Sequence, residues 1–135
     1  MTEGTTRNAK QVIVMRKDLN MRKGKMIAQG AHASLKVLLD RGGASEDMST
    51  FAMAMTPAMV SWIVTGRFAK VCVGVQSEAE LDDIVERARA SGVPVALIVD
   101  SGKTEFHGVP TKTCCAVGPA WADEVDAITG ALTLL

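Results

Sequence analysis

Residues 11–34 read QVIVMRKDLNMRKGKMIAQGAHAS, and this stretch joins a strand pattern directly to a helix pattern. The β-branched run at 11–16 is typical of a buried strand. Residues 24–40 follow helical spacing, about 100° per residue, which gathers Ile27, Ala31, Leu35 and Leu38 into one stripe. We expect this stripe to face the core. A strand leading through a basic loop into a helix indicates an α/β fold.

The same alternation continues along the chain. Apolar runs at 70–76, 93–100 and 113–119 predict three further strands, and 77–92 and 119–130 predict helices. Met48, Ala52, Met55 and Met59 predict another helical segment over 47–64, with Pro57 marking a kink or a late start. The loop at 101–112 is too short for a helical crossover, so the last two strands should be antiparallel. We therefore expect an α/β sandwich on a mixed sheet.

Length and composition set limits on the class of protein. A chain of 135 residues indicates one domain, which we place at 11–135 behind a flexible arm at 1–10. The N-terminus has no apolar region of a signal peptide, and no apolar run reaches the length of a membrane span. Cys72, Cys114 and Cys115 form no CxxC pair. They suit buried, reduced thiols, which predicts a cytoplasmic protein without a metal site.

The net charge of zero hides an asymmetry. Residues 1–36 hold eight Lys/Arg and two Asp/Glu, whereas residues 37–135 hold seven and thirteen. A basic segment of this kind favours an anionic partner, and nucleic acid is the leading candidate. A solvated charged face explains the same count equally well.

A first group of candidate site residues lies on the predicted helix at 24–40. Lys25, Gln29, His32 and Lys36 fall within a sector of about 60°. The basic residues just before the helix extend this group toward a phosphate-binding site: Arg16, Lys17, Arg22 and Lys23. A polar stripe facing solvent, which every amphipathic helix has, is the competing interpretation.

A second group begins where an apolar strand ends in a carboxylate, at Asp100. Lys103 and Thr104 follow it with a cation and a hydroxyl. Ligands of open α/β sheets bind beyond the carboxyl ends of strands, so this group and the basic loop converge if their strands are parallel. Asp100 could instead cap the turn at Ser101 and Gly102.

Three segments together resemble a known family. VIVMRKDLNMRKGKMIAQGAHAS, VPVALIVDSGKTE and CAVGPAWADEVDAITGALTLL are similar, in this order, to the peptidyl-tRNA hydrolase 2 family of archaea and eukaryotes. The first segment is highly specific, and the resemblance runs from about residue 11 to residue 135.

The resemblance implies a three-layer α/β/α sandwich on a four-stranded mixed sheet, and a homodimer. It also implies an enzyme that hydrolyses the ester between a peptide and the 3′-terminal ribose of tRNA, without a metal or another cofactor. Four positions match the family's active-site motif, namely Lys25, His32, Asp100 and Thr104. Gln29 matches a family position, and the acceptor end of the tRNA would contact Gln29 and the basic residues Arg16, Lys17, Arg22, Lys23, Lys36 and Lys103.

The sequence departs from the family pattern at several positions. Glu105 stands where we expect glutamine and Trp121 where we expect proline, and residues 41–65 are long and rich in methionine. Two alternatives to the enzyme therefore stay open. One is a catalytically weak module that binds tRNA or another anion, and the other is a thiol hydrolase using Cys114 or Cys115 with His32 or His107.

Overall fold

A computed structural model describes residues 7–103 and 105–135. Its main sheet contains five strands in the order β5-β6-β1-β4-β7. These are β1 (Ala9–Arg16), β4 (Lys70–Val75), β5 (Val95–Asp100), β6 (Thr111–Trp121) and β7 (Thr133–Leu134). β1 and β4 are parallel, whereas β6 runs antiparallel to both β1 and β5, and β7 antiparallel to β4. The predicted mixed sheet is confirmed, but the strand number was wrong because the LTLL terminus adds β7.

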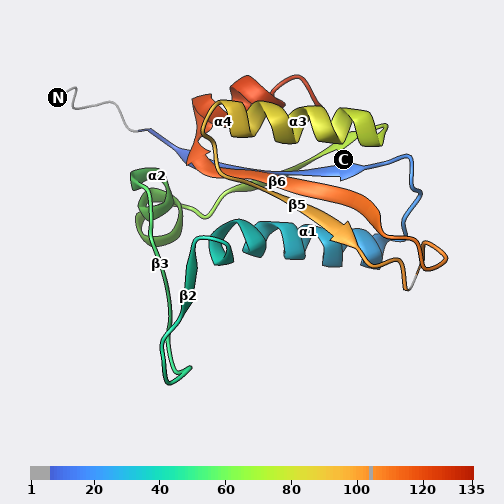
Figure 1. Ribbon diagram of the computed structural model, residues 1–135. Coiled ribbons are helices and arrows are strands. Elements are labelled where there is room, and N and C mark those ends of the chain that lie inside the picture. The colour runs from blue at the N-terminus through green and yellow to red at the C-terminus, as the bar shows by residue number, and fades with distance from the viewer. Residues whose placement is uncertain (1–6, 104) are drawn as a thin grey trace.

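Helices cover both faces of the sheet (Figure 1). α1 (Lys23–Leu39) lies on one face, and α3 (Glu78–Ala90) and α4 (Ala122–Thr129) lie on the other. The predicted helix at 77–92 is confirmed. The Ser77 hydroxyl accepts a hydrogen bond from the Glu80 N–H at its start, and the stripe of Leu81, Ile84, Val85 and Ala88 is buried.

The orientation of α1 differs from the prediction. The helix buries Gln29, Gly30, Ala33 and Val37 against the sheet, whereas Ile27 is 73% exposed and Leu35 54% exposed. The small residues Gly30 and Ala33 lie on the buried side, and a Cβ on Gly30 would be in ordinary van der Waals contact, 3.6 Å from a methyl of Ile13 on β1. The apolar stripe that we expected in the core therefore faces outward.

The predicted helix over 47–64 was also wrong for its first half. Residues 42–53 form an antiparallel hairpin of β2 (Gly42–Ala44) and β3 (Phe51–Met53), separate from the main sheet. Gly42 is needed there because a Cβ would lie 2.1 Å from the Ala52 carbonyl oxygen. Helical structure starts late, as the Pro57 alternative predicts, with α2 (Pro57–Val60) capped by Thr56 and continued by a π-helical turn, η1 (Ser61–Thr65).

The N-terminal boundary also differs from the prediction of a flexible N-terminal arm at 1–10. β1 begins at Ala9 and so includes the last two residues of that segment. Residues 1–6 lie outside the described part. Ahead of it, Arg7 forms an ion pair with Asp123 at 3.0 Å. In the described part of the chain, no helix combines the length and the apolar character that crossing a membrane requires.

Candidate active site

The site lies at the edge of the sheet where β1 and β5 end. Both strands are antiparallel to β6, so they are parallel to each other, and their carboxyl ends bring Arg16 and Asp100 to the same edge. α1 starts at this edge after the loop at 17–22, so its first turn reaches the end of β5. The predicted convergence of the two residue groups is therefore confirmed for the strands.

Asp100 is the centre of a hydrogen-bonded cluster. Its Oδ1 accepts hydrogen bonds from Lys25 Nζ at 2.9 Å and from Gln29 Nε2 at 3.2 Å. Its Oδ2 accepts one from the Gly102 N–H at 2.9 Å. Gly102 has φ +84°, a left-handed conformation that favours glycine, and this turn aims its N–H at the carboxylate. Asp100 thus caps the turn, as one alternative proposed, and also joins the group on α1.

The Asp100–Lys25 pair is shielded from solvent. The side chains of Lys25 and Asp100 are 13% and 12% exposed, and the Lys25 ammonium lies 5.8 Å from the centre of the Phe106 ring. The hydrogen bond from Lys25 is the main reason that the pKa of Asp100 lies below its ordinary value, and the Gly102 N–H and Gln29 add to it against the effect of burial. Asp100 is therefore an anion at neutral pH.

Gln29 connects this pair to the core. Its side chain is 2% exposed, and its Oε1 accepts a short hydrogen bond from the hydroxyl of the fully buried Thr113 on β6. The Gln29 amide therefore donates to Asp100 and accepts from Thr113, and these two hydrogen bonds fix the orientation of the amide. The sequence reasoning named Gly102 as part of the turn at Asp100 but missed Thr113. Thr113 could have been found as the hydroxyl at the start of an otherwise apolar strand antiparallel to the one ending at Asp100.

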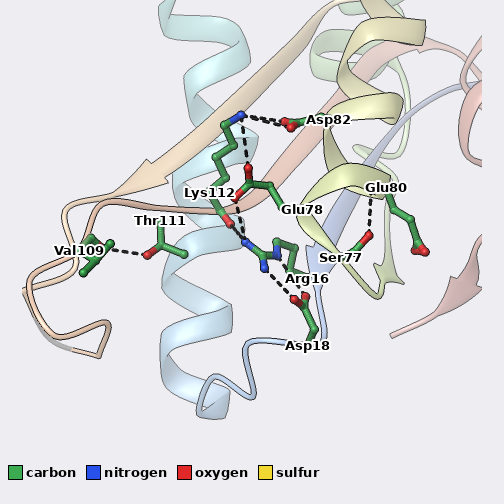
Figure 2. Close-up of polar contacts among 9 residues, drawn as sticks. All are labelled: Arg16, Asp18, Ser77, Glu78, Glu80, Asp82, Val109, Thr111 and Lys112. Carbon is green, nitrogen blue, oxygen red and sulfur yellow. Dashed lines mark hydrogen bonds and ion pairs between the residues drawn. The ribbon is translucent and has the colours of Figure 1, made fainter.

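Arg16 is buried, and its guanidinium contacts other residues of the protein (Figure 2). Its Nε and Nη2 donate to the two oxygens of Asp18 at 3.1 and 2.7 Å, and its Nη1 donates to the Lys112 carbonyl at 3.0 Å. Glu78 lies 3.7 Å from Nη1, and Lys112 in turn pairs with Asp82 on α3 at 3.0 Å. The hydrogen bond from Arg16 lowers the pKa of Asp18 and raises that of Arg16. This network ties the start of the loop at 17–22 to β6 and α3.

The remaining predicted residues lie in different surroundings. Lys17, Arg22, Lys23 and Lys103 are exposed, with Arg22 Nε 4.0 Å from Glu105 Oε1. Lys36 pairs with Asp40 at 3.0 Å, and the exposed His32 lines a shallow hollow with Lys36 and Ile98. None of the hydrogen bonds described here around Asp100 involves His32. Thr104 lies outside the described residues.

The cysteines do not form a nucleophilic site. Burial raises the pKa of the Cys114 thiol to about 12 and that of Cys115 further still. Both thiols are fully buried, so neither is accessible to a substrate, which argues against the thiol hydrolase alternative. Cys72 is exposed, which contradicts our expectation that all three are buried. Among the described residues, no three His, Cys, Asp or Glu side chains lie close enough to hold a metal ion.

Comparison with known proteins identifies the family of this chain. The family model described as peptidyl-tRNA hydrolase PTH2 matches residues 9–135. A peptidyl-tRNA hydrolase of Methanocaldococcus jannaschii is 42% identical over 93% of this chain and 99% of its own length. One of Metallosphaera sedula is 38% identical over 93% and 99%. A probable peptidyl-tRNA hydrolase 2 of Drosophila melanogaster is 40% identical over 98% of this chain and 64% of its own length.

A solved structure supports the fold alone. A protein of unknown function from Agrobacterium tumefaciens superposes with a TM-score of 0.55 at 10% identity, covering 95% of this chain and 98% of that chain. The family match spans nearly the whole sequence and includes every described residue of the cluster around Asp100. The chain belongs to the peptidyl-tRNA hydrolase PTH2 family.

Proposed function

We propose that residues 11–135 act as a single peptidyl-tRNA hydrolase domain that cleaves the ester between a peptide and the 3′-terminal ribose of tRNA. The observation that carries the proposal is the shielded cluster of Lys25, Gln29 and Asp100 beside an exposed basic loop. We further propose that the reaction needs no metal, that the protein works in the cytoplasm as a homodimer, and that its helices and sheet form the family's three-layer sandwich.

Ester hydrolysis requires an oriented water, a stabilised oxyanion and a proton for the leaving ribose oxygen. The Lys25 ammonium can stabilise the oxyanion or bind the terminal phosphate. Asp100 accepts hydrogen bonds and can orient the attacking water, and Gln29 keeps the carboxylate in place. Thr104, which the family motif matches, remains a proposed partner of that water.

The pKa of Asp100 imposes an order on these events. While Lys25 is hydrogen-bonded to Asp100, the pKa of Asp100 is lowered and its carboxylate is a weak base. A general base requires a raised pKa instead. When Lys25 turns toward the charge of the substrate, Asp100 loses the main interaction that lowers its pKa. Its basicity then rises at the moment when the water must lose a proton. His32, exposed and outside the cluster, is assigned a secondary role in proton transfer.

The basic residues divide into two groups by burial. Lys17, Arg22, Lys23 and Lys103 are exposed around the end of the site and suit contacts with tRNA phosphates, with Lys36 farther along α1. Arg16 and Gln29 are buried and use their donors internally. We therefore assign Arg16 to positioning the basic loop and Gln29 to positioning Asp100.

The test is release of the peptide from N-blocked aminoacyl-tRNA by the purified chain in the presence of EDTA. We expect turnover in the wild type and a large loss in Lys25→Ala. Absence of turnover with tRNA still bound would support the alternative, a catalytically weak tRNA-binding module. Loss of turnover with EDTA that returns on adding a divalent metal would contradict metal independence.

A further inference from the structure

The outward apolar stripe of α1 lines a groove that residues of β1 and β4 also line. α1 contributes Ile27 and Leu35, and Phe68, Cys72 and Leu135 are among the other lining residues. The groove has a volume of about 610 Å³. Exposed apolar side chains on this scale mark an interaction site, because a single chain gains nothing by leaving them in water.

The hairpin β2–β3 is a second exposed apolar feature. We call residues 42–55 the arm; its hairpin extends away from the body of the protein, beyond the end of α1 (Figure 1). Along it, Met48 is 80% exposed, and Phe51 and Met55 are each 46% exposed. A two-stranded hairpin in water is marginally stable at best, so an arm of this composition calls for a packing partner.

The arm and the groove match in charge. Between Gly42 and Met55 the arm contains Glu46 and Asp47 and neither lysine nor arginine. Among the described residues, the charged ones that line the groove are Lys23 and Lys70. The Lys70 ammonium lies 3.2 Å from the centre of the Phe68 ring, which places it on the apolar wall. The two anions of the arm and the Lys70 cation of the groove are therefore complementary in charge.

The length of the arm can be compared with that of the groove. At about 3.3 Å per residue, each three-residue strand of the arm spans roughly 10 Å, and the turn at 45–50 extends the hairpin beyond them. The part of α1 that lines the groove, from Lys23 to Leu38, spans roughly 22 Å at about 1.5 Å per residue. The strands of an arm are therefore long enough to occupy roughly half of the groove along α1.

We propose that the groove holds the arm of a second copy of this chain, and that two copies exchange arms symmetrically. Each copy has one arm and one groove, so a two-fold axis makes the same contact twice and leaves neither feature exposed. The proposal rests on the homodimer proposed above and names the surface that forms it. Association and turnover are measured separately, so that either proposal can fail without the other.

The first experiment measures self-association by sedimentation equilibrium. Leu35→Asp in the groove and Met48→Asp in the arm should each weaken the dimer at least tenfold. Val64→Asp is the matched control, since Val64 is 63% exposed but does not line the groove. A monomeric wild type at all concentrations, or a dimer that both variants leave intact, would overturn the proposal.

A charge exchange guards against misfolded variants. Lys70→Glu should weaken the dimer at least tenfold, and combining it with Glu46→Lys and Asp47→Lys should restore association. Restoration requires contact between the arm and residue 70 in the dimer. If Lys70 served folding alone, the added lysines would not restore association. Weakening without restoration would count against the proposed contact.

Cross-linking then tests which copy supplies the arm. A chain carrying Met48→Cys and Cys72→Ser is mixed with the wild type, whose Cys72 is exposed in the groove while Cys114 and Cys115 are buried. A bifunctional thiol reagent should give a covalent heterodimer, and Cys72→Ser in both chains should abolish it. Absence of a covalent heterodimer, or groove variants that instead raise KM for the peptidyl substrate, would assign the groove to another occupant.

Discussion

Asp100 accepts a hydrogen bond from Lys25, 75 positions earlier in the chain, at 2.9 Å. The contact exists because β1 and β5 end at the same edge of the sheet and α1 begins there. Lys25 is the cation and Asp100 the anion of the proposed reaction. Because the two are paired, each reduces the charge that the other presents to the substrate.

Removing the Lys25 ammonium should abolish most of the catalysis. We expect Lys25→Ala to lower kcat by about 10²–10³-fold, the effect of losing one oxyanion donor. Arg89→Ala, an exposed basic residue on α3, is the matched control and should leave kcat unchanged. Single-turnover hydrolysis measures the effect, and a near-wild-type rate for Lys25→Ala would exclude it from the chemistry.

Acidification should reveal the pKa of Asp100. Folding lowers the pKa of Asp100 below its ordinary value of 3.8. The carboxylate therefore stabilises the folded protein above pH 3.8, and this stabilisation is lost as the pH falls through the folded-state pKa. Asp100→Asn should therefore be less stable than the wild type at pH 7, with a gap that narrows below pH 3.8. Denaturant unfolding at several pH values measures this, and a gap independent of pH would refute it.

Thr113 should act on the reaction through Gln29. Thr113→Val removes the hydroxyl that fixes the Gln29 amide and should lower kcat about tenfold, which corresponds to about 1.4 kcal/mol, with little change in KM. Thr113→Ser keeps the hydroxyl and should restore the rate. If valine and serine give equal rates, the hydrogen bond does not position the site.

Lys23 and Arg16 should differ in their effects. Lys23→Ala should weaken tRNA binding and reduce the slope of log K against log salt by about 0.7–0.9, the contribution of one phosphate contact. Arg16→Met should instead destabilise the fold, because Asp18 and Glu78 lose their partner. Salt titrations and thermal unfolding separate the two outcomes, and a salt slope unchanged by Lys23→Ala would argue against its phosphate contact.

Thiol alkylation should leave turnover intact. The exposed Cys72 should react with N-ethylmaleimide, whereas burial protects Cys114 and Cys115. Mass spectrometry of the folded protein should find one modified thiol, and the hydrolysis rate should match the untreated sample. Inactivation that Cys72→Ser prevents would place Cys72 near the substrate.

The sequence predicted the sheet edge at which the site lies better than it predicted the residues that surround the site. The apolar strand that ends at Asp100 and the basic loop before α1 placed Lys25 near Asp100, since strand ends and helix starts follow from local patterns. Gln29 was assigned to tRNA because it shares a polar face of the predicted helix with Lys25, His32 and Lys36 and matches a family position. Its burial depends on Thr113, 84 positions later, and hydrophobic periodicity carries no information on such a partner.

Two larger errors have similar causes. Met48, Ala52 and Met55 fit helical spacing, yet the cross-strand pairs Gly42–Met53 and Ala44–Phe51 form a hairpin that this spacing cannot distinguish. Ile27 and Leu35 outweigh Gly30 and Ala33 in hydrophobicity, but the smaller residues are the ones that lie on the buried side. Average hydrophobicity therefore did not predict which side of α1 is buried.

The orientation of α1 makes it a helix whose two sides tolerate different kinds of substitution. Replacing the exposed Ile27 and Leu35 with polar residues, the usual way to improve solubility, should alter the assembly that we propose and leave the polar cluster untouched. Replacing the buried Gln29 with leucine, the usual way to improve a core, should disable the proposed site and leave that assembly intact. Substitutions chosen by hydrophobicity alone would therefore damage this protein on both sides of one helix, and each kind of damage would need its own assay to detect.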